Sequence, residues 1–308
     1  PAASQVLFYR TRPAGLRIMG KMPMPLPDMP LAVWVHEMSP FLGPHWGNFG
    51  IRYYGLAYVL GFLIAAWLLH LYWKRGRSPI PPRAQSDLLF WIIVGTVVGG
   101  RLGSFLFYSP GELFRDPLAL FRVWDGGMAS HGGFLGVLAG TWWAARKNKL
   151  PFRTVGDVVC TLAPPGLLLG RIANFLNGEL WGKVTDVPWA VIFTTSAPPG
   201  TPPALIAPRH PSQLYEAALE GLLLLIFTQW RIWKTPVLRE APGRLGGEFL
   251  AGYAIVRIFG EFFRQNDPGI EPVLGLNRGA WLSIVMLAAG LWLIVMTPRW
   301  AKNRKSAS

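Results

Sequence analysis

Apolar residues along this chain gather into about seven runs of roughly 17 to 22 residues, each long enough to cross a hydrocarbon core about 30 Å thick. Short polar segments rich in Lys, Arg, Pro and Gly separate the runs. The predicted spans cover residues 53–73, 87–108, 129–145, 155–176, 212–232, 245–264 and 280–297. The pattern therefore predicts an all-α integral membrane protein with about seven transmembrane helices.

Basic residues favour the segments that follow the first, third and fifth predicted spans. Short cytoplasmic loops are enriched in Lys and Arg, whereas exported loops are not. The residues on this side are Lys74, Arg75, Arg77, Arg83, Arg146, Lys147, Lys149, Arg153, Arg231, Lys234, Arg239 and Arg244. The charge pattern therefore predicts that the N-terminus faces out and the C-terminus faces in.

The polar segments divide the chain further. Residues 1–30 are Pro-rich and mixed in charge, which predicts a disordered extension, and the aromatic residues within 31–50 favour an interfacial segment on the outer face. We expect residues 51–300 to form one polytopic transmembrane domain, because no internal repeat divides it. Residues 177–211, rich in Pro and in β-forming residues, predict a small outer-face cap with short strands between spans four and five. Residues 301–308 predict a basic cytoplasmic tail.

Composition agrees with a membrane protein, since 51% of residues are hydrophobic, 15% are charged and the mean hydropathy is +0.31. The net charge of +14 reflects topology and attraction to anionic headgroups, because the interleaved aromatic and basic pattern of nucleic-acid binding is not found. The single cysteine, Cys160, excludes an internal disulfide and a thiolate metal cluster. With no HExxH motif either, we expect no metal and no cofactor.

Polar residues inside the predicted spans converge on one depth, in the half of the membrane nearer the outer face. Intramembrane ionisable groups are costly and mark functional sites. Tyr253, Arg257 and Glu261 follow one another at four-residue intervals and so form one helical stripe, in which Arg257 and Glu261 can pair. Arg171 and Asn174 also share a face. The other polar positions at this depth are Tyr54, Arg101, His131, Asn177 and Glu179.

Each position also has a structural alternative. Arg257 with Glu261 could form an ion pair that fixes helix packing, and Arg101 could hold the bundle together or extend to headgroups. Taken singly, His131 is typical of a hydrogen-bonded interface residue and Tyr54 of an aromatic belt. Helix capping is the alternative for Asn174, Asn177 and Glu179. Three arginines at one depth nevertheless favour a shared site for an anionic phospholipid headgroup, because guanidinium groups match phosphate oxygens bidentately.

Residues 50 to about 300 resemble the bacterial prolipoprotein diacylglyceryl transferases. The resemblance lies in blocks that occur in family order: RYYGLAYVLGF, RVWDGGMASHGGFLG, GRIANFLNGELWG, RHPSQLYEA and GYAIVRIFGEFFRQND. GRIANFLNGELWG is the most specific block, since an Arg, two Asn, a Glu and three Gly at fixed spacing rarely coincide. Departures are small: Ala129 and Ser130 stand where MSFHGG is usual, and Ala173 replaces a common Gly.

This resemblance implies transfer of the diacylglyceryl group of phosphatidylglycerol to the thiol of a lipobox cysteine in a prolipoprotein signal peptide. Glycerol phosphate leaves, and the reaction is the first step of lipoprotein maturation. The resemblance also implies a multi-pass protein of the bacterial cytoplasmic (inner) membrane, with its active site facing the outer leaflet. It places catalytic roles on His131, Tyr54, Arg257 and Glu261. It places phosphatidylglycerol binding on Arg171, Arg101, Asn174, Glu179, Gly182 and Tyr253.

The chemistry of that reaction needs a base for the thiol and cations for the departing phosphate. We assign the phosphate to Arg171 and Arg257, and His131 is the candidate base, with Glu261 or a phosphate oxygen as alternatives. An anion transporter or channel is the main rival function. Transporters commonly have repeated halves and a site at the membrane midplane, whereas this sequence has no repeat and its polar residues gather on one side. A phospholipid hydrolase would need an activated protein nucleophile or a metal-bound water.

Overall fold

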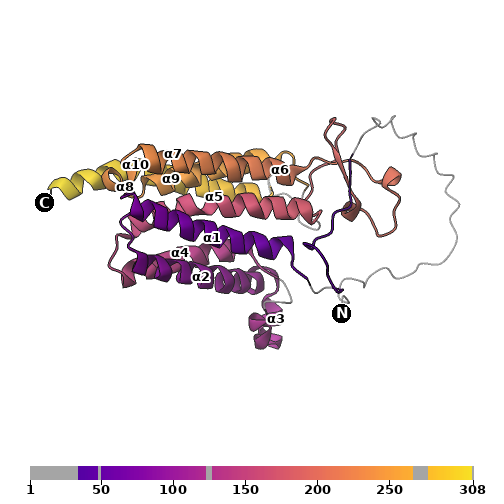
Figure 1. The fold of residues 1–308 in the computed structure, drawn as a ribbon, viewed down its shortest axis with the longest axis horizontal. Coiled ribbons are helices and arrows are strands. Elements are labelled where there is room, and N and C mark those ends of the chain that lie inside the picture. The colour runs from indigo at the N-terminus through magenta and orange to yellow at the C-terminus, as the bar shows by residue number, and fades with distance from the viewer. Residues whose placement is uncertain (1–33, 48–49, 123–126, 266–276, 307–308) are drawn as a thin grey trace. The chain divides into compact units, whose positions relative to one another are not determined.

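The computed structural model describes residues 34–47, 50–122, 127–265 and 277–306, and this part of the chain is mostly helical (Figure 1). Residues 1–30, for which the sequence predicts disorder, lie outside the described residues. The α-helices are α1 (Tyr53–Lys74), α2 (Pro82–Tyr108), α3 (Pro110–Arg115), α4 (Ser130–Lys147), α5 (Phe152–Leu176), α6 (Ser212–Glu216), α7 (Leu224–Lys234), α8 (Val237–Glu240), α9 (Arg244–Glu261) and α10 (Arg278–Ser306). A π-helix, η5 (Ala217–Leu223), joins α6 to α7, and 3-10 turns occur at η1 (Pro117–Phe121), η3 (Thr194–Ser196) and η4 (Pro203–Leu205).

Every predicted span lies mostly within helix, although the last three residues of the sixth span lie beyond α9. The fifth span is divided among α6, η5 and α7. Within the described residues, four helices are long and apolar enough to cross a membrane, namely α1, α2, α5 and α10. These features fit a multi-pass, all-α membrane protein. Membrane crossing by the remaining helices, and the orientation of the termini, stay predictions.

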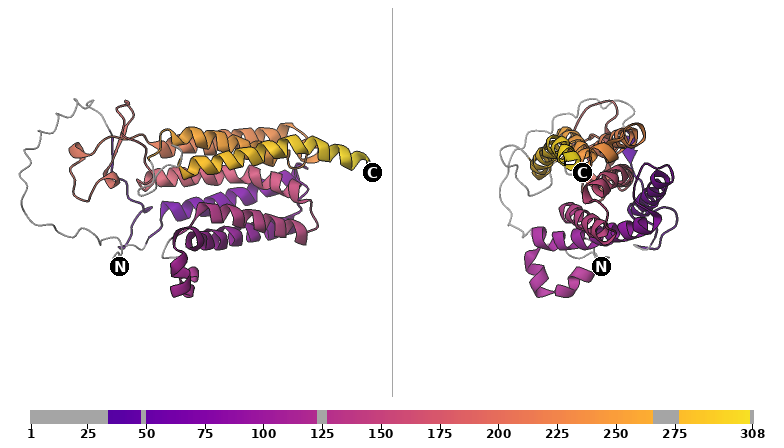
Figure 2. Two further views of the ribbon diagram at one scale, coloured as in Figure 1. Left: turned by 180° about the vertical axis from the view of Figure 1, so that it is seen from behind. Right: turned by 90° about the vertical axis from the view of Figure 1, so that its left-hand side faces the viewer.

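Helix α5 has the largest set of helical neighbours: it contacts α1, α4, α6, η5, α7, α8 and α9. The end-on view in Figure 2 shows the helices gathered as a bundle. Its interior near the ends of α1 and α7 is built from fully buried side chains such as Leu69, Tyr72, Val158 and Leu245. Helix α5 therefore carries the first part of the GRIANFLNGELWG block, Gly170 to Leu176, along the inside of the bundle.

Helices α2 and α4 approach each other backbone to backbone. A Cβ built on Gly136 would lie 1.8 Å from the carbonyl oxygen of Gly95, and one built on Gly132 would lie 2.0 Å from that of Gly99. Only glycine fits at such contacts, which resemble the small-residue interfaces of membrane helices. This packing fixes where α4 begins, and hence the backbone position of His131.

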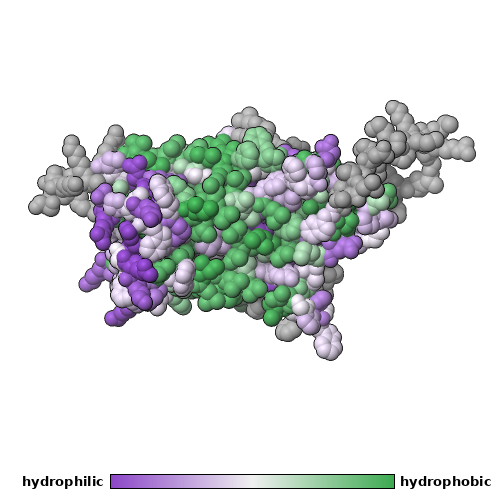
Figure 3. Space-filling view, turned by 45° about the horizontal axis from the view of Figure 1, so that its top comes forward, coloured by the Kyte–Doolittle hydropathy of each residue, from purple (hydrophilic) through white to green (hydrophobic). Residues whose placement is uncertain are grey.

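The basic segments after the first, third and fifth predicted spans meet at one end of the helices. Arg239 Nη2 donates to Gly76 O at 3.2 Å, and Lys147 Nζ donates to Asp87 Oδ1 at 2.8 Å. Asp157 Oδ2 accepts from the backbone N of Gly243 at 2.7 Å, which ties α5 to the start of α9. Figure 3 shows hydrophilic residues concentrated at this left-hand end, beside a hydrophobic band that covers the helices.

The segment after α5 forms a small cap. Strand β2 (Val191–Phe193) pairs in parallel with β1 (Trp34–His36), with Val35 opposite Ile192. Phe175, at the end of α5, packs with Val191 and Phe193 in a separate buried cluster. The pairing joins residues from 31–50 to residues from 177–211, two segments that the sequence analysis treats separately.

Candidate active site

Two buried glutamates, Glu216 and Glu220, form the centre of a charged cluster between α5, α6–η5 and α9. Arg171 contacts both, with Nη1 2.8 Å from Glu216 Oε2 and Nη2 2.9 Å from Glu220 Oε2. Arg257 reaches the same pair, at 3.1 Å from Glu216 Oε1 and 3.6 Å from Glu220 Oε1. Arg264 Nη1 lies 3.4 Å from Glu216 Oε1. Side chains distant in sequence thus share one polar interior.

The stripe predicted on the sixth span is present on α9. Arg257 and Glu261 form the expected ion pair, which confirms the pairing at i and i+4. Glu261 also accepts a hydrogen bond from Asn277. Tyr253 is buried, and its ring lies 6.4 Å from that of Phe134 on α4. The contact brings the first turns of α4 close to the charged cluster.

Charge is balanced within the described cluster, where Arg171, Arg257 and Arg264 face Glu216, Glu220 and Glu261. The arginine side chains are 12–16% exposed, whereas those of Glu216 and Glu220 are 1% exposed. Leaving one member of such a buried set unpaired costs several kcal/mol. The carboxylates therefore fix the orientation of the guanidinium groups.

Glu216 and Glu220 were missed in the sequence analysis, although the signal was present. They are acidic residues four positions apart within a predicted span, and Glu216 ends the RHPSQLYE portion of a block that supports the resemblance. The rule that marks intramembrane arginines as functional applies equally to carboxylates. Glu220 lies in η5, and π-helical segments are frequent at functional sites.

Two asparagine amides of the GRIANFLNGELWG block bind one carboxylate near the end of α5. Asn174 Nδ2 donates to Glu179 Oε1 at 2.9 Å, and Asn177 Nδ2 donates to the same oxygen at 3.2 Å. Gln213 Nε2 donates to the backbone O of Glu179 at 2.7 Å. These bonds connect the block to the start of α6, one turn from Glu216. The block therefore borders the charged cluster.

Gly182 lies where three chain segments meet. Its N donates to His210 O at 2.9 Å, and its O accepts from Arg209 Nη1 at 3.2 Å. A Cβ on Gly182 would lie 2.6 Å from Phe263 O and 2.7 Å from His210 O. Both neighbours are backbone atoms, so a larger residue must displace the chain.

We expect Gly182→Ala to destabilise the protein by about 1–3 kcal/mol, the usual cost of overpacking. Gly170→Ala is the matched control, because it belongs to the same block and its Cβ would have no neighbour within 4 Å outside its own helix. The measurement is the thermal unfolding midpoint of each purified variant. Equal midpoints for the two variants would contradict the close contact at Gly182.

His210 lies beside Gly182 of the GRIANFLNGELWG block. His210 Nδ1 is 3.2 Å from the hydroxyl of Tyr215, and its ring contacts Phe263. Partial burial, and then the nearby Lys183 ammonium, lower the pKa of His210 below its ordinary value. His210 is therefore neutral near pH 7, a property that the sequence analysis did not consider for this residue.

Arg101 and Tyr54 occupy other environments. Arg101 is buried, and its Nη2 donates to Ala119 O at 2.7 Å and to Arg122 O at 2.9 Å, in the connection between α2 and α4. This agrees with the bundle-holding alternative, and the third guanidinium beside the glutamates is that of Arg264. Tyr54 is 39% exposed on α1. The side chain of His131 lies outside those that the structure describes.

Comparison with known proteins identifies relatives that cover most of the chain. The model of the family described as Prolipoprotein diacylglyceryl transferase matches residues 43–296. The phosphatidylglycerol–prolipoprotein diacylglyceryl transferase of Ruegeria pomeroyi is 44% identical over 80% of this chain and 90% of its own length. Enzymes of that name from Zymomonas mobilis and Vibrio cholerae are each 44% identical over 81% of this chain, and over 84% and 88% of their own lengths. The matched region contains the whole charged cluster.

Proposed function

This chain belongs to the prolipoprotein diacylglyceryl transferase family, and we propose that Arg171 and Arg257 bind the phosphodiester of phosphatidylglycerol while the diacylglyceryl group is transferred. The acceptor is the thiol of a lipobox cysteine in a prolipoprotein signal peptide. The observation that carries this proposal is that both guanidinium groups are held by the same two buried carboxylates, while the two arginine side chains remain partly exposed.

The reaction forms a carbon–sulfur bond and breaks the carbon–oxygen bond between diacylglycerol and phosphate. The bonding electron pair leaves with the oxygen, so glycerol phosphate departs with added negative charge. Arg171 and Arg257 stabilise that charge, and because Glu216 and Glu220 already orient them, little reorganisation is needed. The thiol proton passes to a base as sulfur attacks.

His131 is the base in this proposal. Its backbone lies in the first turn of α4, and Phe134, three residues later on the same helix face, contacts Tyr253 of the α9 stripe. The carboxylate of Glu261, the alternative base, already pairs with Arg257 and accepts a hydrogen bond from Asn277. We further propose that the protein lies in the bacterial inner membrane, with the cluster toward the outer leaflet and the basic end toward the cytoplasm.

We expect His131→Gln to lower thioether formation by about 100- to 10,000-fold, the usual contribution of general base catalysis. Gln is similar in size but cannot accept the thiol proton, so membrane insertion and the unfolding midpoint should be preserved. The measurement is the initial rate of peptide lipidation. Turnover at the normal rate would remove His131 from the base role.

The direct test of function is incubation of the purified protein with phosphatidylglycerol and a lipobox peptide, followed by mass spectrometry. We expect the peptide to gain the mass of one diacylglyceryl group, and a peptide with Ser in place of the lipobox Cys to gain none. An unmodified Cys peptide would contradict the transferase. Release of diacylglycerol without peptide modification would support a hydrolase, and unchanged lipid together with anion flux would support a transporter.

A further inference from the structure

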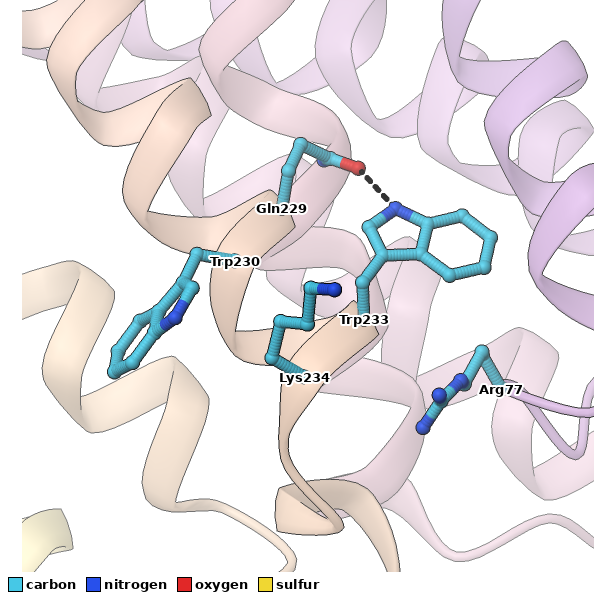
Figure 4. Close-up of a pocket in the computed structure, with 5 residues that line it drawn as sticks. All are labelled: Arg77, Gln229, Trp230, Trp233 and Lys234. Atoms are coloured by element: carbon cyan, nitrogen blue, oxygen red, sulfur yellow. Dashed lines mark hydrogen bonds between the residues drawn. The ribbon is translucent and has the colours of Figure 1, made fainter.

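A hollow of about 500 Å³ lies at the basic end of the helices, far from the charged cluster. Its walls are formed by Gln229, Trp230, Trp233 and Lys234 of α7, and by Arg77 from the connection between α1 and α2. In Figure 4 the ammonium end of Lys234 is drawn between the two indoles, and Arg77 comes from a separate segment on the side of Trp233. From Glu216 to Trp230 the chain advances 14 helical positions, or about 20 Å.

More basic side chains lie next to this hollow. A second hollow of about 210 Å³ shares Arg77 and adds Arg75 and Arg239 from the same end of the helices. The ionisable side chains that line the two hollows are thus Arg75, Arg77, Lys234 and Arg239. Converging cations beside a concave surface attract a ligand that carries an anionic group.

The wall of the larger hollow is held in place by hydrogen bonds. Gln229 Oε1 accepts from the hydroxyl of Tyr72 at 2.8 Å and from Trp233 Nε1 at 3.3 Å. Gln229 Nε2 donates to Thr161 O at 3.4 Å, which ties α7 to α5. The indole of Trp233 is therefore oriented before any ligand binds, and a preformed wall lowers the entropic cost of binding.

The position of the hollow matches the boundary of a bilayer. Helix α1, a candidate membrane span, ends at Lys74, three residues before Arg77. Trp230 is 53% exposed, and exposed indoles are typical of the membrane interface. Figure 3 shows that the hydrophobic band gives way to hydrophilic residues toward the basic end of the helices. The hollow therefore offers indole surface toward the lipid chains and cations toward the headgroups.

We propose that this hollow binds one anionic glycerophospholipid of the surrounding bilayer, at a site separate from the transfer reaction. The lipid phosphate pairs with Arg77 and Lys234, while the glycerol and upper acyl segments lie against Trp230 and Trp233. The phosphate of a lipid bound here lies about 20 Å along the helices from the charged cluster, so it does not reach Arg171 or Arg257. Its role is to anchor the end of α7 to the connection between α1 and α2.

The test is native mass spectrometry of the full chain, titrated with dioleoyl phosphatidylglycerol or dioleoyl phosphatidylcholine. Relative to the unaltered protein, the double variant Arg77→Gln with Lys234→Gln should retain one fewer phosphatidylglycerol, with about 30-fold weaker apparent affinity for that lipid, and each single variant should show about a fivefold loss. Phosphatidylcholine retention should not change. Peptide lipidation should persist in the double variant, because neither residue belongs to the charged cluster.

The matched control is Arg83→Gln with Lys149→Gln, which removes two exposed charges that do not line either hollow. Arg83 lies in the first turn of α2, and Lys149 lies in the connection between α4 and α5. Retention of the lipid by this control and its loss from the pocket variant would support a defined site. Equal weakening in both variants would show a general attraction of the basic end and overturn the proposal. Unchanged retention in the pocket variant would overturn it as well.

Discussion

Arg171→Met is expected to lower the rate of diacylglyceryl transfer by about 100- to 1,000-fold, the usual effect of removing one preorganised donor to a developing negative charge. Methionine retains much of the apolar stem but cannot bind phosphate. It also leaves Glu220 without its closest cation, at a cost of about 3–5 kcal/mol of stability. The measurements are the initial rate of peptide lipidation and the thermal unfolding midpoint.

The double variant Arg171→Met with Glu220→Gln separates the catalytic role from the structural one. Removing both charges eliminates the unpaired carboxylate, so the unfolding midpoint should recover toward that of the unaltered protein. The transfer rate should stay low, because no guanidinium has been restored. Recovery of both quantities would mean that Arg171 serves only as the ion-pair partner of Glu220.

Gly136→Ala is expected to cause the largest loss of stability among conservative replacements at the helix interfaces described here. The added methyl group would lie 1.8 Å from Gly95 O and 2.5 Å from Gly95 C, which are backbone atoms that cannot rotate away. Helices α2 and α4 must therefore separate, at a cost of about 3 kcal/mol or more. The measurement is the unfolding midpoint in a mild detergent.

Gly133→Ala provides the comparison on the same helix. There the added Cβ would meet Thr96 O at 3.9 Å, an ordinary contact. Because alanine favours helix over glycine by up to about 1 kcal/mol, this variant should unfold at an equal or higher temperature than the unaltered protein. Similar destabilisation by both replacements would contradict the backbone contact between α2 and α4.

Much of the helical framework could be predicted from hydrophobic run length, because a bilayer requires long apolar segments with internally satisfied backbones. The predicted spans 53–73 and 155–176 differ from α1 and α5 by at most three residues at either end. The pairing of Arg257 with Glu261 also followed from spacing, since residues four apart share a helix face. Neither inference required knowledge of neighbouring helices.

Contacts between separate segments could not be inferred in this way. Periodicity shows which residues share a face, but it does not identify the helix that the face meets. Only packing therefore showed that Arg171 and Arg257 share Glu216 and Glu220, and that Arg264, rather than Arg101, supplies the third cation at these carboxylates.

The cap illustrates the same division. Pro-rich composition and β-forming residues indicated a compact insert after α5, yet strand pairing depends on hydrogen bonds to a segment more than a hundred residues away along the chain. The pairing of β1 with β2 was decided by the folded chain. Local sequence therefore specified helices, their polar faces and the family blocks, because these depend on residues a few positions apart. The balance of buried charge and the joining of distant strands depended on three-dimensional proximity, which only the folded chain establishes.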